Sequence, residues 1–310
     1  MTSLQGKDIL RASDLTMDEV ELIMRTAFQF ERMMGTGQRI ASLSGSVLAT
    51  LFYEPSTRTR LSFESAMLRM GGQVISVAEA RLSSSAAKGE TLFDTGKMIE
   101  NYADVVVIRH PAVGSAAELA DGAAIPVING GDGAGEHPTQ ALLDLFTIRK
   151  EKGRVEGLTV ALVGDLRNGR TVHSLCSLLA NFGTRFYFVA PPGLTMPTAI
   201  TGPLRNLGVE VIETDSVRSA AVDSDILYVI RLQKERFEDQ LEYERLKGSY
   251  VVDADLVKAS KPGVTILHPL PRVDEIKSEV DAYEGAAYFR QAANGVVVRM
   301  ALLALVLGRI

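Results

Sequence analysis

The sequence predicts an α/β protein of two domains, each a parallel sheet flanked by helices, with the C-terminal helix packing back on the first domain. Three observations support this fold class. Short apolar runs alternate with longer runs of helical periodicity. The short runs are apolar almost throughout, which is typical of parallel strands that are covered on both faces. The length of 310 residues also suits two domains of about 150 residues each.

The first strand–helix series covers the N-terminal half of the chain. We expect the helix after His137 to connect the two domains. The first domain is therefore expected to comprise residues 1–138, completed by 294–310, and the second to comprise 139–293. The expected elements of the first series are strands at 47–52, 105–108 and 125–128 and helices at 61–70 and 139–152.

A second series follows, with the same alternation of strands and helices. The apolar stretch from Met300 to Leu307 is too short to cross a membrane, so we interpret it as a packed terminal helix. The expected elements of the second series are strands at 158–163, 186–189, 209–212, 226–230 and 264–267 and a helix at 171–182.

Composition and charge argue against several classes of function. The 33 Lys and Arg against 38 Asp and Glu give a net charge of −5 without a basic patch, so nucleic-acid binding is not expected. The single cysteine, Cys176, rules out an intrachain disulfide, and its helical surroundings predict a packed side chain. No His, Cys, Asp and Glu residues have metal-ligand spacing, so no metal is expected. The N-terminus does not resemble a signal peptide, and no run of about 18 apolar residues appears. We therefore expect a cytoplasmic protein.

Five consecutive polar residues, Ser56 to Arg60, open the helix that follows the first strand. A helix N-terminus carries about half a positive charge and several unpaired N–H groups, which suits it to phosphate. Serine and threonine hydroxyls add donors, and arginine adds a bidentate clamp. A simple Ser/Thr N-cap with its arginines in solvent is the structural alternative. Two cations at the positive end of a helix are unfavourable unless an anion offsets them, so the run favours an anion site.

The run from Gly164 to Thr171 follows a strand and matches the P-loop pattern, except that Arg170 stands in place of the lysine. A nucleoside triphosphatase is therefore an alternative function. It is disfavoured because the lysine that reaches the outer phosphates is absent and Asp165 places a carboxylate in the loop. We prefer the interpretation that Arg170 projects from a helix start at a domain crevice, where it could hold a carboxylate.

Four further polar groups follow predicted strands or open a helix, and ligands of open parallel sheets bind beyond the carboxyl ends of strands. For His110 and His268 we favour a core or capping role. Pro269 and Pro271 can simply shape a turn, and either can be cis. The four groups are Arg109-His110, His137 to Gln140, Arg231 to Gln233 and His268 to Pro271.

Two segments are interpreted as loops. Leu82 to Gly89 is small and polar, so it is either a flexible linker or a mobile loop that delivers Lys88. Gln233 to Lys247 is dense in charge, which is most often a solvated helix or loop.

Together these motifs resemble the carbamoyltransferase family. Ser56 to Arg60 is similar to its carbamoyl-phosphate motif, and His137 to Gln140 is similar to its His-Pro-x-Gln motif. Ornithine enzymes of the family typically carry His-Cys-Leu-Pro near the C-terminus. The run from His268 to Pro271 has the aspartate-type form instead, as does the run from Arg231 to Arg236. The resemblance covers nearly the whole chain, from Phe52 through Leu305, and is closest to the catalytic chains of the aspartate-type enzymes.

The resemblance implies a reaction. A carbamoyl group would pass from carbamoyl phosphate to the amine of L-aspartate, giving N-carbamoyl-L-aspartate and phosphate, an early step of de novo pyrimidine biosynthesis. No cofactor would be needed. The first domain would bind carbamoyl phosphate and the second would bind aspartate. The implied catalytic residues are Arg58, Thr59, Lys88, Arg109 and His137.

The resemblance also implies which residues contact each substrate. Phosphate would be held by Ser56, Thr57, Arg58 and Thr59. The carbamoyl oxygen would contact Thr59, Arg109 and His137. The carbamoyl NH2 would be oriented by Gln140 and by the backbone carbonyls of Pro269 and Leu270. The aspartate-binding residues would be Lys88, Arg170, Arg231, Gln233 and Leu270. Ser84 and Lys88 correspond to residues that reach into a neighbouring subunit's site.

Shared sites would make a homotrimer necessary for activity. The run from His268 to Ile276 also resembles the branch whose catalytic trimers pair with separate regulatory chains in an allosteric holoenzyme. Ornithine carbamoylation is the alternative within the family, disfavoured by Pro269 and by repulsion between ornithine and two arginines, Arg170 and Arg231. A catalytically silent scaffold that binds carbamoyl phosphate is a further alternative, against which the intact Lys88 argues, together with Arg109 and His137.

Overall fold

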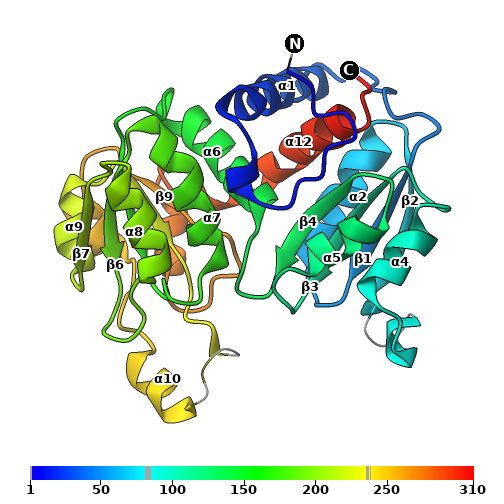
Figure 1. The fold of residues 1–310 in the computed structure, drawn as a ribbon. Helices are drawn as coiled ribbons and strands as arrows, with labels where there is room; N and C mark the ends of the chain where they lie inside the picture. Colours follow the sequence, from blue (N-terminus) through cyan, green and yellow to red (C-terminus); the bar gives the residue numbers. More distant parts are fainter. Residues whose placement is uncertain (1, 81–84, 235–236, 238) are drawn as a thin grey trace. The chain divides into compact units, whose positions relative to one another are not determined.

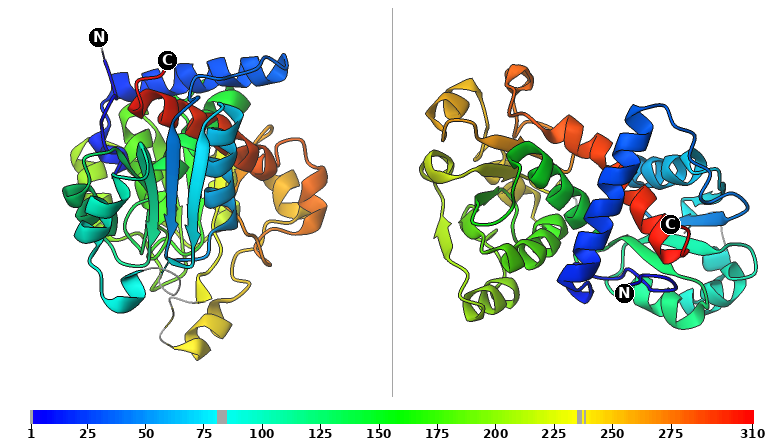
Figure 2. Two further views of the ribbon diagram at one scale, coloured as in Figure 1. Left: turned by 90° about the vertical axis from the view of Figure 1, so that its right-hand side faces the viewer. Right: turned by 90° about the horizontal axis from the view of Figure 1, so that it is seen from above.

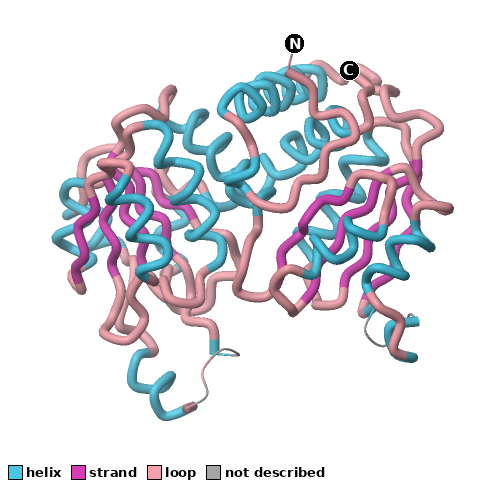
Figure 3. Tube along the Cα trace, in the orientation of Figure 1, coloured by secondary structure: helices cyan, strands magenta, loops and turns pink. Residues whose placement is uncertain are grey.

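The computed structural model describes residues 2–80, 85–234, 237 and 239–310 (Figure 1). The chain forms two compact units, the first being Met1–Leu143 with Ala293–Ile310 and the second being Asp144–Ala292. Each unit has a parallel sheet flanked by helices, which confirms the predicted fold class. Figure 3 shows the alternation of strands and helices along the trace. The units divide within α6 (Pro138–Lys152) and within α12 (Tyr288–Val306), the two helices that also contain the expected boundaries.

The sheet of the first unit has the strand order β2-β1-β3-β4, and every neighbouring pair is parallel. Its edge strand, β2, was not predicted from the sequence. None of its residues is fully buried, so it lacks the continuous apolar pattern of the inner strands. The strands are β1 (Val47–Phe52), β2 (Gln73–Ala78), β3 (Val105–His110) and β4 (Val127–Asp132).

Helices cover both faces of this first sheet. Ala49 of β1 belongs to an apolar cluster that includes Leu92 of α4 and Leu119 of α5. On the opposite face, the Thr50 hydroxyl donates to Glu64 Oε1 of α2 at 3.1 Å. Successive strand residues thus point to opposite layers, as the pleat requires. The helices of this unit, besides the start of α6 and most of α12, are α1 (Met17–Gly35), α2 (Thr57–Arg69), α4 (Leu92–Ile99) and α5 (Ser115–Gly122), with short 3₁₀ turns at Ala12–Asp14 and Ser85–Lys88.

The C-terminal helix packs on the first unit, as predicted. Arg299 of α12 donates to the Ser62 hydroxyl of α2 at 2.7 Å, and its guanidinium lies 5.0 Å from the Phe63 ring centroid. Figure 2 shows the C-terminal part of α12, in red, next to α1. By length and composition α12 is apolar enough to cross a membrane, but 72% of its apolar window is buried inside the protein. The helix is therefore better explained as a core element than as a membrane span.

The sheet of the second unit has the strand order β7-β6-β5-β8-β9, again entirely parallel. Its strands are β5 (Thr159–Val163), β6 (Arg185–Val189), β7 (Val211–Thr214), β8 (Ile226–Val229) and β9 (Thr265–Leu267). Its helices are α7 (Arg170–Leu179), α8 (Thr198–Asn206), α9 (Val217–Asp223), α10 (Gln240–Leu246) and α11 (Ala254–Ala259), with 3₁₀ turns at Ala180–Phe182 and Ser278–Ala282.

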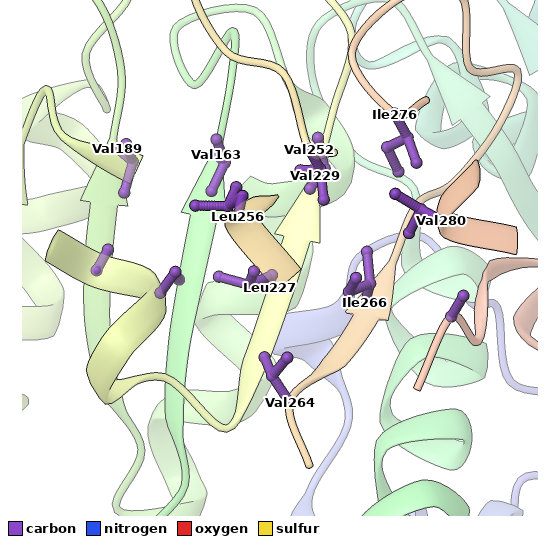
Figure 4. Packing of buried hydrophobic residues seen from close by; sticks show 14 of the residues in the cluster. Val163, Val189, Leu227, Val229, Val252, Leu256, Val264, Ile266, Ile276 and Val280 are labelled. Carbon is purple, nitrogen blue, oxygen red and sulfur yellow. The ribbon is translucent and has the colours of Figure 1, made fainter. Parts of the chain in front are cut away.

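The core of the second unit lies on both sides of its sheet. Figure 4 shows Val163 of β5 and Leu227 of β8 in one apolar cluster with Leu256 of α11. On the other face, the Tyr228 hydroxyl donates to Asp144 Oδ2 of α6 at 2.7 Å. The charged segment predicted to be a solvated helix or loop contains the exposed helix α10.

Candidate active site

Both sheets have a point where the strand order reverses. In the first unit β1 lies between β2 and β3, so successive connections leave it in opposite directions. In the second unit β5 lies between β6 and β8 in the same way. Ligands of open parallel sheets bind beyond the carboxyl ends of strands at such points. Predicted site residues lie at the carboxyl ends of four of these strands. They are Ser56 to Thr59 after β1, Arg109 on β3, Arg170 after β5 and Arg231 after β8.

Helix α2 begins at Thr57, within the polar run that was expected to open it and four residues before the predicted bound at 61. Ser56 is the N-cap residue, but its side chain makes no capping hydrogen bond, and the first turn contains no acidic residue. The Thr59 side chain is buried, whereas Thr57 and Arg58 are exposed. The first turn of a helix leaves N–H groups without intrahelical partners, and hydroxyls at the same place add further donors. This helix start therefore has the composition of an anion site rather than that of an ordinary cap.

The two arginines of this turn have different surroundings. Arg60 Nε lies 3.8 Å from Glu64 Oε1 on the same helix, so its charge is partly offset within α2. Arg58 is more exposed and lies closer to the helix start. Arg58 is thus the better placed of the two to meet an anion at the N-terminus.

Arg109 lies at the end of β3, opposite Phe52 in the register with β1. Its Nη1 donates to the Gly130 carbonyl at 3.1 Å, and its Nε lies 3.7 Å from Glu54 Oε2. These contacts come from the neighbouring strand β4 and from the β1 turn, so they orient the guanidinium from both sides.

A buried aspartate organises the loop between β4 and α6. Asp132 Oδ1 accepts from the backbone N–H of Glu136 at 2.7 Å, and its Oδ2 accepts from that of Gly114 at 2.8 Å. The loop leads directly to His137, which is buried and precedes the first residue of α6. Gln140 lies in the first turn of that helix and is also buried. The predicted His137 to Gln140 group is therefore held at the carboxyl end of β4.

In the segment interpreted as either a flexible linker or a mobile loop, Ser84 lies outside the described residues. Lys88 is the last residue of the 3₁₀ turn Ser85–Lys88 and is exposed.

In the second unit, the loop that resembles a P-loop is folded around its own carboxylate. Asp165 is fully buried, and its Oδ1 accepts from the backbone N–H and the side-chain amide of Asn168, each at 3.1 Å. Its Oδ2 accepts from the Gln233 N–H at 3.4 Å. Burial raises the pKa of Asp165 more than these hydrogen bonds lower it. Because a carboxyl group already receives donors of this loop, the loop does not form a polyphosphate cradle.

Gly164 must be a glycine because β5 and β8 come very close at this point. Its φ is +125°, and a Cβ added here would lie 2.1 Å from the Ile230 carbonyl oxygen. We expect Gly164→Ala to destabilise the protein by about 3 kcal/mol or more, because the backbone of Ile230, directly after β8, cannot move aside cheaply. Thermal unfolding followed by circular dichroism measures the effect.

Gly208→Ala is the matched control for this substitution. Gly208 also has a positive φ, of +76°, but nothing lies within 4 Å of its added Cβ. The control should lose only about 1 kcal/mol from the backbone conformation. Equal losses in the two variants would show that the close approach at Ile230 is unimportant.

Three of the residues predicted to bind aspartate lie in the loops after β5 and β8. Arg170 is the first residue of α7, and its backbone N–H donates to the Asn168 carbonyl at 3.0 Å. The Gln233 side chain donates to the same carbonyl at 2.9 Å. Arg231 follows β8, and its Nη1 lies 3.3 Å from the Leu232 carbonyl. Asn168 and Asp165 thus connect the two loops that carry Arg170, Arg231 and Gln233.

Pro269 and Leu270 follow β9 in an unusual turn. Leu270 has a φ of +58°, and the Leu270–Pro271 peptide bond is cis. The Leu270 N–H donates to His268 Nδ1 at 2.7 Å. The sequence predicts that either Pro269 or Pro271 can be cis, and this prediction is confirmed for Pro271.

The remaining polar candidates have structural roles. His110, for which a core or capping role was expected, accepts at Nδ1 from the Ala112 N–H at 3.0 Å and so stabilises the turn after β3. Cys176 is fully buried in α7, as predicted, and burial strongly raises the pKa of its thiol. Among the residues that the structure describes, no group of three or more His, Cys, Asp or Glu side chains could hold a metal ion.

Two organising residues were not predicted from the sequence. Asp132 orders the loop before His137. Glu275 Oε1 lies 2.7 Å from His268 Nε2. Both are single carboxylates in polar segments, and only a buried position distinguishes them from surface acids.

The two α/β units, with the predicted anion-site residues at the ends of their strands, agree with matches to protein families. Residues 7–150 match the model of the aspartate/ornithine carbamoyltransferase carbamoyl-P binding domain. Residues 156–306 match the model of the Asp/Orn binding domain of the same family. The chain belongs to the aspartate/ornithine carbamoyltransferase family, and it is therefore a carbamoyl-transferring enzyme, as the sequence motifs predict.

Curated relatives narrow the similarity within that family. The chain is 50% identical to the aspartate carbamoyltransferase catalytic subunit of Thermococcus kodakarensis over 98% of both chains. It is 50% identical to the protein of the same name from Methanopyrus kandleri over 99% of both. The fold matches the aspartate transcarbamoylase of Trypanosoma cruzi, solved in complex with carbamoyl phosphate and aspartate, with a TM-score of 0.93 and 41% identity over 98% of each chain.

Proposed function

We propose that two groups of residues, one in each unit, carry out the transfer of a carbamoyl group from carbamoyl phosphate to the amine of L-aspartate. This reaction was predicted from the sequence, and it agrees with relatives named aspartate carbamoyltransferase over nearly the whole chain. The products are N-carbamoyl-L-aspartate and phosphate. The pathway that the name implies is pyrimidine biosynthesis.

The observation that carries the assignment of carbamoyl phosphate is the start of α2. Its first turn contains three hydroxyls with Ser56 included, two arginines and no acidic residue, and it follows β1 at the switch point. We assign the phosphate to Ser56, Thr57, Arg58 and Thr59. The aligned N–H groups and the charge of Arg58 favour a dianion at this place.

The carbamoyl oxygen is assigned to residues near the carboxyl ends of β1, β3 and β4. Attack of the amine on the carbamoyl carbon places negative charge on the carbonyl oxygen. Donors that are already oriented toward that oxygen lower the barrier, because they need no reorganisation in the transition state. Thr59, Arg109 and His137 fill this role in the proposal. The contacts of Arg109 with Glu54 and Gly130 support it, since they orient the guanidinium without a substrate.

Aspartate is assigned to the second unit. Arg170, Arg231 and Gln233 bind its carboxylates. The carbamoyl NH2 is oriented by Gln140 and by the backbone carbonyls of Pro269 and Leu270. Lys88 adds positive charge for both substrates, and Ser84 takes part in binding carbamoyl phosphate. Holding two anions together costs electrostatic energy that these cations offset, and fixing their geometry supplies much of the acceleration. The amine of aspartate is itself the nucleophile, so the chemistry needs no protein nucleophile. The leaving phosphate is a suitable acceptor for the amine proton.

Phosphate release from carbamoyl phosphate tests the assignment of the acceptor. With L-aspartate present, release should accompany formation of N-carbamoyl-L-aspartate, and with L-ornithine it should stay near the rate without an acceptor. Ornithine carries a cationic side chain, which Arg170 and Arg231 repel. Release with ornithine but not with aspartate would overturn the acceptor assignment.

The oligomeric part of the proposal is a homotrimer whose active sites are shared between neighbours. Lys88 supports it, because its side chain is exposed at the end of a 3₁₀ turn rather than packed against its own chain. If the neighbour supplies Lys88, a mixture of Lys88→Ala and Arg58→Ala chains should regain activity after dissociation and reassembly, since some sites then receive both intact residues. Activity of the mixture no higher than the sum of the separate variants would contradict shared sites.

The second partner in the proposal is a set of separate regulatory chains. We also propose that the protein is cytoplasmic. The motif from His268 to Ile276 supports the aspartate branch in which such chains occur. Size-exclusion chromatography of the chain with a candidate regulatory chain should show a species larger than the trimer. An unchanged trimer peak would count against the partner.

A further inference from the structure

A buried histidine and a buried glutamate lie behind the Pro269–Leu270 turn. His268 is only 1% exposed, and its Nδ1 accepts from the Leu270 backbone N–H at 2.7 Å. An acceptor nitrogen of imidazole carries no proton, so the proton of the neutral ring lies on Nε2. Nε2 is 2.7 Å from Glu275 Oε1 and donates to it. The hydrogen bond from the turn therefore identifies the tautomer of His268.

Glu275 is surrounded by donors. Besides His268, the backbone N–H groups of Val273 and Asp274 each lie 3.1 Å from its Oε2. Burial alone would raise the pKa of Glu275, but the hydrogen bonds from His268 and from the backbone N–H groups outweigh burial and lower it. The group is thus a carboxylate that acts only as an acceptor.

The backbone of His268 is held independently on its other side. Its N–H donates to Gln291 Oε1 at 2.8 Å, and the Gln291 amide donates to Asp144 Oδ1 at 2.6 Å. Asp144 also accepts from the Tyr228 hydroxyl at 2.7 Å. The strand end is therefore anchored in the core of the second unit, while the His268 ring controls only the turn that follows.

We propose that His268 and Glu275 are positioning residues that hold the Pro269–Leu270 turn in the shape in which its carbonyls meet the carbamoyl group and aspartate. The inference rests on the proposed function, which assigns those carbonyls to the substrates. Leu270 has a φ of +58°, a conformation that a leucine rarely adopts without support from its surroundings. The support is the Leu270–His268 hydrogen bond, and Glu275 keeps His268 in the tautomer that can make it.

Glu275→Gln removes this control with almost no change of volume. A glutamine has one acceptor oxygen and one donor NH2 where the carboxylate has two acceptors. If the oxygen stays with the backbone N–H groups, the NH2 faces His268 Nε2 and favours the tautomer with its proton on Nδ1. That proton opposes the Leu270 N–H, so the turn opens. We expect kcat/KM for carbamoyl phosphate to fall about 10- to 100-fold, because small displacements of groups that orient a substrate have effects of this size.

Two substitutions of His268 separate the turn bond from general packing. In His268→Asn the side-chain oxygen can still accept from the N–H two residues on, as in an Asx turn. His268→Leu removes that acceptor. Activity should decrease from the wild type to His268→Asn and then to His268→Leu. Ser224→Ala is the matched control in the same unit, because Ser224 is fully buried and its hydroxyl donates to the Ala220 carbonyl at 2.7 Å, far along the chain from the turn.

The experiment measures kcat and KM for both substrates, normalised to folded protein, and records the His268 tautomer in the wild type and in Glu275→Gln by long-range ¹H–¹⁵N NMR. The expected result is an Nε2–H ring in the wild type, a changed tautomer in Glu275→Gln, and a raised KM or lowered kcat per folded molecule that Ser224→Ala does not share. An Nδ1–H ring in the wild type, or wild-type constants in Glu275→Gln, would overturn the proposal. If the wild-type chain itself fails to carbamoylate aspartate, the proposed function fails instead, so the two failures are distinguishable.

Discussion

Replacing Arg58 by alanine should lower the rate of aspartate carbamoylation by about 10²- to 10³-fold, the usual effect of deleting a preorganised charge stabiliser. Arg58 lies in the first turn of α2, which has no acidic residue and no side-chain cap. The phosphate gains charge as it leaves, so a cation at this place stabilises the transition state more than the bound substrate. Steady-state measurement of phosphate release at saturating aspartate gives the change in kcat and in kcat/KM for carbamoyl phosphate.

Two comparisons make the result specific. Arg58→Lys keeps the charge but loses the planar fork of donors, so it should recover only part of the activity. Arg69→Ala removes an exposed arginine from the other end of the same helix, where Arg69 Nε lies 3.1 Å from the Ser65 hydroxyl. Its activity should stay close to that of the wild type. Normal turnover in Arg58→Ala would contradict the anion assignment at the start of α2.

Stability distinguishes a binding role of Arg58 from a structural one. The side chain is exposed, so Arg58→Ala should leave the melting temperature without ligand almost unchanged. A ligand that binds only the folded state raises the melting temperature, and added inorganic phosphate should do so for the wild type. The increase should be much smaller in Arg58→Ala. An equal increase in both proteins would place the phosphate elsewhere.

The start of α2 could be predicted because its signal is local. An apolar strand, a proline and a run of hydroxyls and arginines follow one another in the chain, and a helix then begins at Thr57. The buried strands could be predicted for the same reason, since each is a short apolar run. The edge strand β2 could not, because its residues are only partly buried or exposed and carry no such run.

The residues that organise the site were harder to predict because their contacts are not local. Asp132 accepts from Gly114, 18 positions away in the chain, and nothing in the sequence around either residue indicates the pair. The close approach of Gly164 to Ile230 depends on β5 and β8 being neighbours, which is a matter of strand order. Motif resemblance indicated the residues that we assign to the substrates, whereas the residues that hold those in place required the fold.

Replacing Arg231 by alanine should mainly weaken the use of aspartate. A hydrogen-bonded charge pair with a carboxylate is worth about 1.5–3 kcal/mol, which corresponds to a rise of about 10- to 100-fold in KM for aspartate. KM for carbamoyl phosphate should change far less, because that substrate is assigned to the start of α2 and to β3. The contrast with Arg58→Ala follows from the two units: Arg231 belongs to the second, at the end of β8, and Arg58 to the first.

Initial rates over a grid of both substrate concentrations separate these effects. Arg245→Ala is the matched control, since Arg245 is an exposed arginine of the same unit and lies 3.9 Å from Asp239. It should leave both KM values unchanged. Arg231→Ala should also release more phosphate with ornithine than the wild type does, because one of the two cations that repel the ornithine side chain is gone. If instead KM for carbamoyl phosphate rose while that for aspartate stayed constant, Arg231 would belong to the donor substrate, and the assignment of aspartate to the loops after β5 and β8 would have to be reversed.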